Sequence, residues 1–180
     1  MTPIEQIESI NMQVHDDFSS LSDAQLNWKS QPEKWSIGQC LDHLIVANKS
    51  YFPSFEKLIY HRYKLSFLQK LNPFKKLMGP VMIKYLGPQP NKKFKSPKIF
   101  EPSASRIAFT IVDDFLRHQE ELKSYFRKLY QLDTKNLVIA SPSSGFVMYT
   151  IADCMQLIAV HEQRHTNQAK TVLHHPNFPG

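Results

Sequence analysis

The chain has 180 residues, of which 42% are hydrophobic and 12% aromatic, and its formal net charge is +6. This composition is typical of one globular domain over residues 1–180, and two cysteines exclude a disulfide scaffold. Five glycines are too few for a protein of many tight β-turns. With no apolar run near the roughly 20 residues that cross a bilayer and no signal-peptide pattern, the sequence predicts a cytoplasmic protein.

Two helices and a short helical turn are predicted in the first third of the chain. Apolar residues recur at helical spacing over 2–18 and 36–63, and residues 22–28 read as a short turn of helix. A kink is expected at Pro53, which lies inside the second stripe. Each long helix begins with a capping-box pattern, at Thr2–Glu5 and Ser36–Gln39.

Residues 64–104 are predicted to form a long, basic, proline-rich crossover. They contain six prolines, and residues 57–98 hold eleven Lys or Arg and no Asp or Glu. The rest of the chain has more acidic than basic residues, so the positive charge is local. Within the crossover, 73–86 read as one or two short helices and 87–102 as loop. A connection this long reaches along a bundle, so the helices that flank it can run parallel.

Two further helices are expected in the second half, over 103–131 and 150–173, separated by a polar loop over 133–145. No segment shows a convincing alternation of period two, and no internal repeat is present. The predicted fold class is therefore all-α, a four-helix bundle.

The sharpest chemical signal is the run His161-Glu162-Gln163-Arg164-His165. Histidines four residues apart lie on one helical face, one turn apart, and can bind the same divalent metal. The run also matches the H-E-x-x-H pattern of zinc proteases. That interpretation fails on its third ligand, because Gln168 and Thr171 stand where the extended pattern needs Gly and His, and no acidic residue follows Glu162.

His43 is the best candidate for a third ligand. It lies among apolar residues of the 36–63 helix, which places it near the inner face. Three histidines on two facing helices would leave positions on the ion open to a substrate. A set of histidines joined by hydrogen bonds in a polar layer explains the spacing equally well.

Two motifs resemble the DinB/YfiT-like superfamily. Residues 35–44, WSIGQCLDHL, are similar to the opening of its second helix, W-S-x-x-E/Q-x-L/I-x-H-L, and His161-x-x-x-His165-x-x-Gln168 is similar to its fourth-helix signature. The resemblance implies a bundle with an up-down-down-up course. It also implies a tri-histidine site at His43, His161 and His165, holding a divalent metal such as zinc or nickel.

Characterised relatives in that family include S-transferases that use a low-molecular-weight thiol. The resemblance therefore implies a metal-dependent enzyme acting on a small-molecule substrate, either a thiol-dependent S-transferase or a hydrolase. No catalytic residue follows from the motifs, and Gln168 and Glu162 are weak candidates. Asp42 is a candidate to orient an imidazole on the helix expected over 150–173. Cys40 and Cys154 are expected in the core.

An alternative function rests on residues 64–98, where lysines alternate with large apolar residues. This composition is typical of a basic amphipathic segment that contacts an anionic membrane or another anionic partner. The same residues would equally form a cap over one end of the bundle, or steer an anionic substrate to the metal. No module for nucleic-acid binding is recognised. The sequence leaves open whether the protein is a homodimer.

Overall fold

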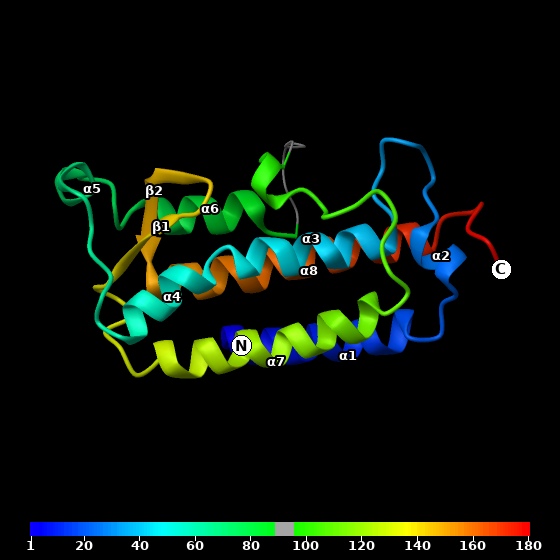
Figure 1. The fold of residues 1–180 in the computed structure, drawn as a ribbon, viewed down its shortest axis with the longest axis horizontal. Coiled ribbons are helices and arrows are strands. Elements are labelled where there is room, and N and C mark those ends of the chain that lie inside the picture. Colours follow the sequence, from blue (N-terminus) through cyan, green and yellow to red (C-terminus); the bar gives the residue numbers. More distant parts are fainter. Residues whose placement is uncertain (89–95) are drawn as a thin grey trace.

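A computed structural model describes residues 1–88 and 96–180 of the chain. Within this part the protein is mostly helical, with one small β-hairpin (Figure 1). The elements in chain order are α1 (Pro3–Phe18), α2 (Asp23–Asn27), α3 (Ile37–Lys49), α4 (Phe52–Ile59), α5 (Phe67–Leu71), α6 (Met78–Leu86), the 3-10 helix η1 (Lys98–Phe100), α7 (Ile111–Leu129), β1 (Val138–Ser141), β2 (Ser144–Thr150) and α8 (Ile151–Leu173).

The predicted starts of α1 and α3 are confirmed by their caps. At α1 the Thr2 hydroxyl accepts from the Glu5 backbone N–H at 3.3 Å, and the Glu5 carboxylate accepts from the Thr2 backbone nitrogen at 2.8 Å. Ser36 and Gln39 form the same reciprocal pair at the start of α3. These bonds satisfy N–H groups that a helix start otherwise leaves without a partner.

Two predicted boundaries are wrong, and one short helix was not predicted. The helix expected over 36–63 divides into α3 and α4 around Ser50 and Tyr51 instead of bending at Pro53, which lies in the first turn of α4 where its missing N–H costs nothing. The helix expected from residue 103 begins only at Ile111. Within the crossover α6 was predicted and α5 was not, and residues 89–95 of the expected loop lie outside the described residues.

The all-α prediction misses the β-hairpin. Strands β1 and β2 pair antiparallel, with Val138 opposite Thr150 and Ile139 opposite Tyr149. Their buried residues cluster near the bundle, while the turn end of the hairpin is largely exposed. Because only this short part faces the core, the period-two alternation is too brief to stand out from the polar residues around it.

The long helices surround two apolar clusters with a polar layer between them. Contacts join α1 to α7 and α8, and α3 to α7 and α8, so these four close a ring. One cluster gathers around Phe55 and Phe126 and the other around Leu41 and Phe115. Buried polar residues lie between the clusters along α3, α7 and α8: His43, Asn48, His118, Gln119, Glu162, His165 and Thr166. Cys40 and Cys154 are buried and unpaired, as expected.

Part of the crossover covers the bundle. Helix α6 packs on α8 and on β2, with Met82, Ile83 and Leu86 half-buried against the core. Gly79 permits this approach, because a Cβ there would lie 2.3 Å from a carboxylate oxygen of Asp153. Among the described helices, none is both long and apolar enough to cross a bilayer.

Candidate metal centre

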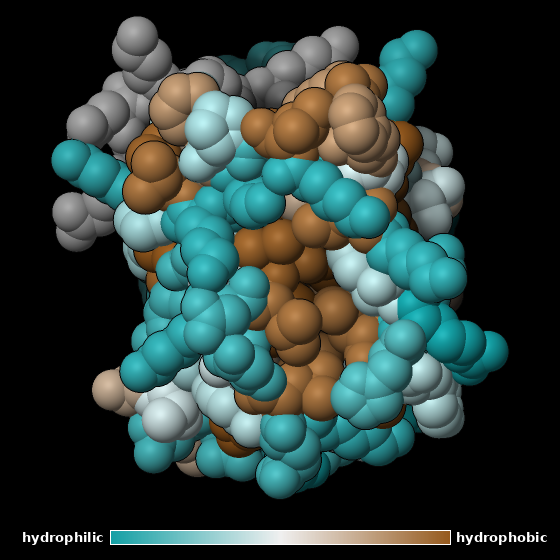
Figure 2. All heavy atoms as spheres, turned by 90° about the vertical axis from the view of Figure 1, so that its left-hand side faces the viewer, coloured by the Kyte–Doolittle hydropathy of each residue, from teal (hydrophilic) through white to brown (hydrophobic). Residues whose placement is uncertain are grey.

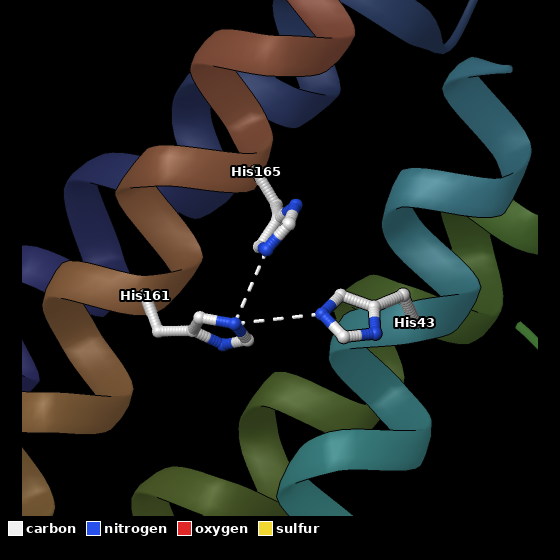
Figure 3. A group of neighbouring side chains, drawn as sticks. All are labelled: His43, His161 and His165. Carbon is white, nitrogen blue, oxygen red and sulfur yellow. Dashed lines mark hydrogen bonds between the residues drawn. The ribbon is translucent and has the colours of Figure 1, made fainter. Parts of the chain in front are cut away.

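Three histidines from two helices converge in the polar layer (Figure 3). His161 and His165 lie one turn apart on α8, and His43 reaches toward them from α3. The Nε2 atom of His161 is 3.1 Å from Nε2 of His165 and 3.4 Å from Nε2 of His43. One ring nitrogen from each histidine therefore lies within 4.8 Å of the other two.

The other ring nitrogens of His43 and His165 face hydrogen-bond acceptors. His43 Nδ1 contacts the backbone carbonyl of Phe100, and His165 Nδ1 lies 3.0 Å from Oε1 of Gln168. A carbonyl oxygen only accepts, so each Nδ1 carries the proton and donates it. Each Nε2 then presents a lone pair to the centre of the group, which is the tautomer that a metal ligand needs.

The donor set fits a divalent transition metal. The Nε2 lone pairs of His43 and His165 both face Nε2 of His161, at 3.4 and 3.1 Å, and these contacts are unfavourable unless a cation or a proton lies among the three nitrogens. In a tetrahedral site with Zn–N bonds of about 2.05 Å, ligand nitrogens are separated by about 3.3 Å. Three imidazoles of this spacing therefore suit zinc or a similar ion.

Burial keeps the imidazoles neutral. It lowers the pKa of His161 to about 3 and lowers the pKa values of His43 and His165 below the ordinary 6.5. The nearby guanidinium of Arg164 acts in the same direction on all three. Neutral imidazoles retain the lone pair, so no proton has to be displaced at neutral pH before a metal binds.

The segment before α7 helps to position His43. Asp42 accepts hydrogen bonds from the backbone N–H and the hydroxyl of Ser103, at 2.5 and 2.9 Å. These bonds fix residues near Ser103 against α3 and thereby hold the Phe100 carbonyl at His43. The ring of Trp35 packs on His43 and His165, with ring centroids 4.7 and 5.7 Å apart. Asp42 thus acts through Ser103, and not through an imidazole of α8 as the sequence suggested.

A cavity of roughly 780 Å³ opens beside the histidines. All three line it, as do Gln168 and Arg164. Apolar and phenolic side chains form much of the rest of its wall: Tyr51, Met82, Leu86, Tyr149, Leu157 and Ile158. Such a mixture of a polar cluster and an apolar wall is typical of a small-molecule site.

Arg164 is a residue that the sequence reasoning missed, although it lies inside the histidine motif. Its side chain is half-buried, and among the described residues no carboxylate forms an ion pair with it. A guanidinium in this position attracts an anionic group into the cavity.

Glu162 does not line the cavity. It is fully buried on the other side of α8, where its two oxygens accept from Nδ2 of Asn48 at 2.7 Å and Nε2 of Gln119 at 2.8 Å. Burial raises the pKa of this carboxyl to about 7. Its role is to join α8 to α3 and α7, and the weak suggestion of a general base loses its geometric basis. Gln168, the other weak candidate, lies in the cavity and orients His165.

Comparison with known proteins agrees with this geometry. Residues 6–169 match the sequence profile of the DinB superfamily. The uncharacterized protein YuaE of Bacillus subtilis strain 168 is 26% identical over 164 residues, which cover 89% of this chain and 91% of YuaE. No solved structure matches the chain significantly.

Proposed function

The chain belongs to the DinB superfamily, and on this premise we propose that it is a metal-dependent enzyme that acts on a small molecule. His43, His161 and His165 would hold a divalent ion, with zinc or nickel the best candidates. The observation that carries the proposal is the convergence of three neutral Nε2 atoms at the wall of a cavity. A divalent ion held there would supply Lewis acidity and lower the pKa of a bound thiol or water.

The residues around the cavity would have three separate roles: they fix the metal ligands, bind an anionic group and enclose the substrate. Phe100 and Gln168 fix the rings of His43 and His165 in the ligand tautomer. Arg164 would orient an anionic group of the substrate, because three neutral imidazoles and a divalent ion leave its positive charge uncompensated. The phenolic and aliphatic wall would enclose the rest of the molecule and exclude water.

A thiol-dependent S-transferase fits these residues better than a hydrolase. Hydrolysis by metal-bound water is helped by a group that takes the proton, and the carboxylates next to the histidines in sequence, Asp42 and Glu162, do not line the cavity. The described carboxylates that line the cavity, Glu33 and Glu101, are exposed. A thiol loses its proton much more easily, since its ordinary pKa is about 8.5.

Metal binding is tested by elemental analysis of the purified protein and three variants. We expect zinc or nickel in the wild-type protein, little metal in His43→Ala and His165→Ala, and an unchanged content in His174→Ala. His174 is exposed at the end of α8 and serves as the matched control. Equal metal content in all four proteins would contradict the proposal.

The two reaction types are separated by two assays of the metal-loaded protein. Conjugation of a low-molecular-weight thiol to a chromogenic electrophile tests the S-transferase, and release of nitrophenol from small esters tests the hydrolase. An Arg164→Gln variant should raise KM for carboxylate-bearing electrophiles more than for neutral ones. Hydrolysis without thiol conjugation would favour the second reaction.

We also propose that the chain is one domain whose four long helical stretches follow the up-down-down-up course. The colours of Figure 1 support this, because α1 and α8 run toward one end of the bundle while α3–α4 and α7 run toward the other. The crossover of residues 64–104 then connects two helices that run in the same direction.

A further inference from the structure

The crossover exposes a group of large apolar side chains beside α5. Six residues are between 59% and 74% exposed, and we call them the α5 surface: Phe67, Leu68, Leu71, Phe74, Leu77 and Phe146. Five come from residues 67–77 and the sixth from the hairpin, which α5 contacts through the two hydrogen bonds described next. Figure 2 views the end of the molecule where α5 lies, near the top as in Figure 1, and shows hydrophobic groups there among hydrophilic side chains.

An ordinary surface helix packs its apolar side chains against the protein, whereas α5 leaves its apolar side chains exposed. No residue of α5 is buried. Polar side chains tie this segment to the hairpin: Nε2 of Gln69, within α5, donates to the Gly145 carbonyl, and Nδ2 of Asn72, directly after α5, donates to the Phe146 carbonyl, both at 3.0 Å. The apolar side chains face outward. A surface helix normally buries its apolar face, so this arrangement indicates that something else covers it.

The side chains around the α5 surface are positively charged, which favours a negatively charged partner. Residues 57–98 contain eleven basic and no acidic residues. Among those that the structure describes, seven basic side chains are exposed: Lys57, Arg62, Lys64, Lys70, Lys76, Lys84 and Lys98. A second copy of the chain would bring two such positive segments together, and their repulsion opposes association.

We propose that the α5 surface docks onto an anionic lipid bilayer. Phe67, Leu68, Leu71 and Phe74 would enter the boundary between headgroups and acyl chains, while the surrounding lysines contact the negative headgroups. The membrane-contacting segment is α5 with the turn that follows it, and the metal centre is not part of it. This inference does not depend on the proposed enzymatic function.

The test is co-sedimentation with vesicles of phosphatidylcholine alone or with about 30% phosphatidylserine, at about 0.05 M and 0.5 M salt. The wild-type protein should bind the anionic vesicles at low salt and be released at high salt, because salt screens the lysines. A Lys70→Gln/Lys84→Gln variant should bind about 25-fold more weakly, or about fivefold for each lysine. A Phe67→Ser/Leu71→Ser variant should bind at least about tenfold more weakly.

The control is Met12→Ser/Phe109→Ser, which removes two equally exposed apolar side chains, at 62% and 58%, from outside the crossover. It should bind as the wild type does, and all variants should keep the wild-type melting temperature and metal content. No binding at low salt, or equal binding by the Phe67→Ser/Leu71→Ser variant, would overturn the proposal. So would a preference for a labelled single-stranded oligonucleotide, or a dimer in solution that this variant abolishes.

Discussion

Replacing Asp42 by alanine tests how the metal centre is built. The substitution removes the acceptor of two hydrogen bonds from Ser103. Residues near Ser103 would then separate from α3, and the Phe100 carbonyl would no longer fix the proton on Nδ1 of His43. His43 would populate the other tautomer, whose Nε2 carries a proton and cannot bind a metal.

The expected effect has two parts. Hydrogen bonds to a charged group contribute about 1.5–3 kcal/mol each when buried, but Ser103 is exposed, so we expect a loss of about 1–2 kcal/mol in the free energy of unfolding. Loss of an interaction that orients a metal ligand typically weakens metal affinity tenfold to hundredfold. Chemical denaturation measures the first quantity, and competition with a chelator measures the second.

A matched substitution separates these effects from the removal of a charge. Asp16 is exposed and contacts its neighbour His15, so Asp16→Ala should change neither quantity appreciably. Ser103→Ala should be intermediate, since the backbone bond to Asp42 remains. If Asp42→Ala lowers stability but leaves metal affinity at the wild-type value, the Phe100 carbonyl does not orient His43 and the reasoning is refuted.

Three further predictions concern other parts of the bundle. Gln168→Leu removes the acceptor at Nδ1 of His165 and should weaken metal affinity about tenfold, measured by the same competition. Burial lowers the pKa of His118 to about 4, so wild-type stability should fall as pH drops from 6.5 to 4, by about 3 kcal/mol more than in His118→Leu, as denaturation at each pH would show. Gly79→Ala places a Cβ against Asp153 and should cost about 1–3 kcal/mol of unfolding free energy.

Each of these has a control or a contradicting outcome. Gly145→Ala should be nearly neutral, because its Cβ would lie at an ordinary 3.5 Å from Nε2 of Gln69. An identical pH dependence in His118→Leu and wild type would mean that burial does not lower the pKa of His118 below its value in the unfolded chain. Wild-type metal affinity in Gln168→Leu would mean that another group sets the His165 tautomer.

Local sequence signals determined where three of the long helices, α1, α3 and α8, begin. The capping boxes at Thr2 and Ser36 and the cap at Thr150 depend on residues at most three apart, so they are visible without the fold. The spacing of His161 and His165 is also local, because residues four apart always share a helical face. His43 was identifiable because its apolar neighbours indicate an inward-facing position.

Tertiary packing decided which side chains on different helices and loops contact one another. The Phe100 carbonyl meets His43 across 57 residues, and Asn48 meets Glu162 across 114, which no local pattern encodes. The sequence alone did not tell whether the Glu162 side chain points toward α3 and α7 or into the cavity, because this depends on how α8 is rotated in the bundle. The outward apolar face of α5 likewise follows from hydrogen bonds of Gln69 and Asn72 to the hairpin. Caps and helical faces are set by bonds within one or two turns, whereas a side chain's partner on another element depends on how the whole chain packs.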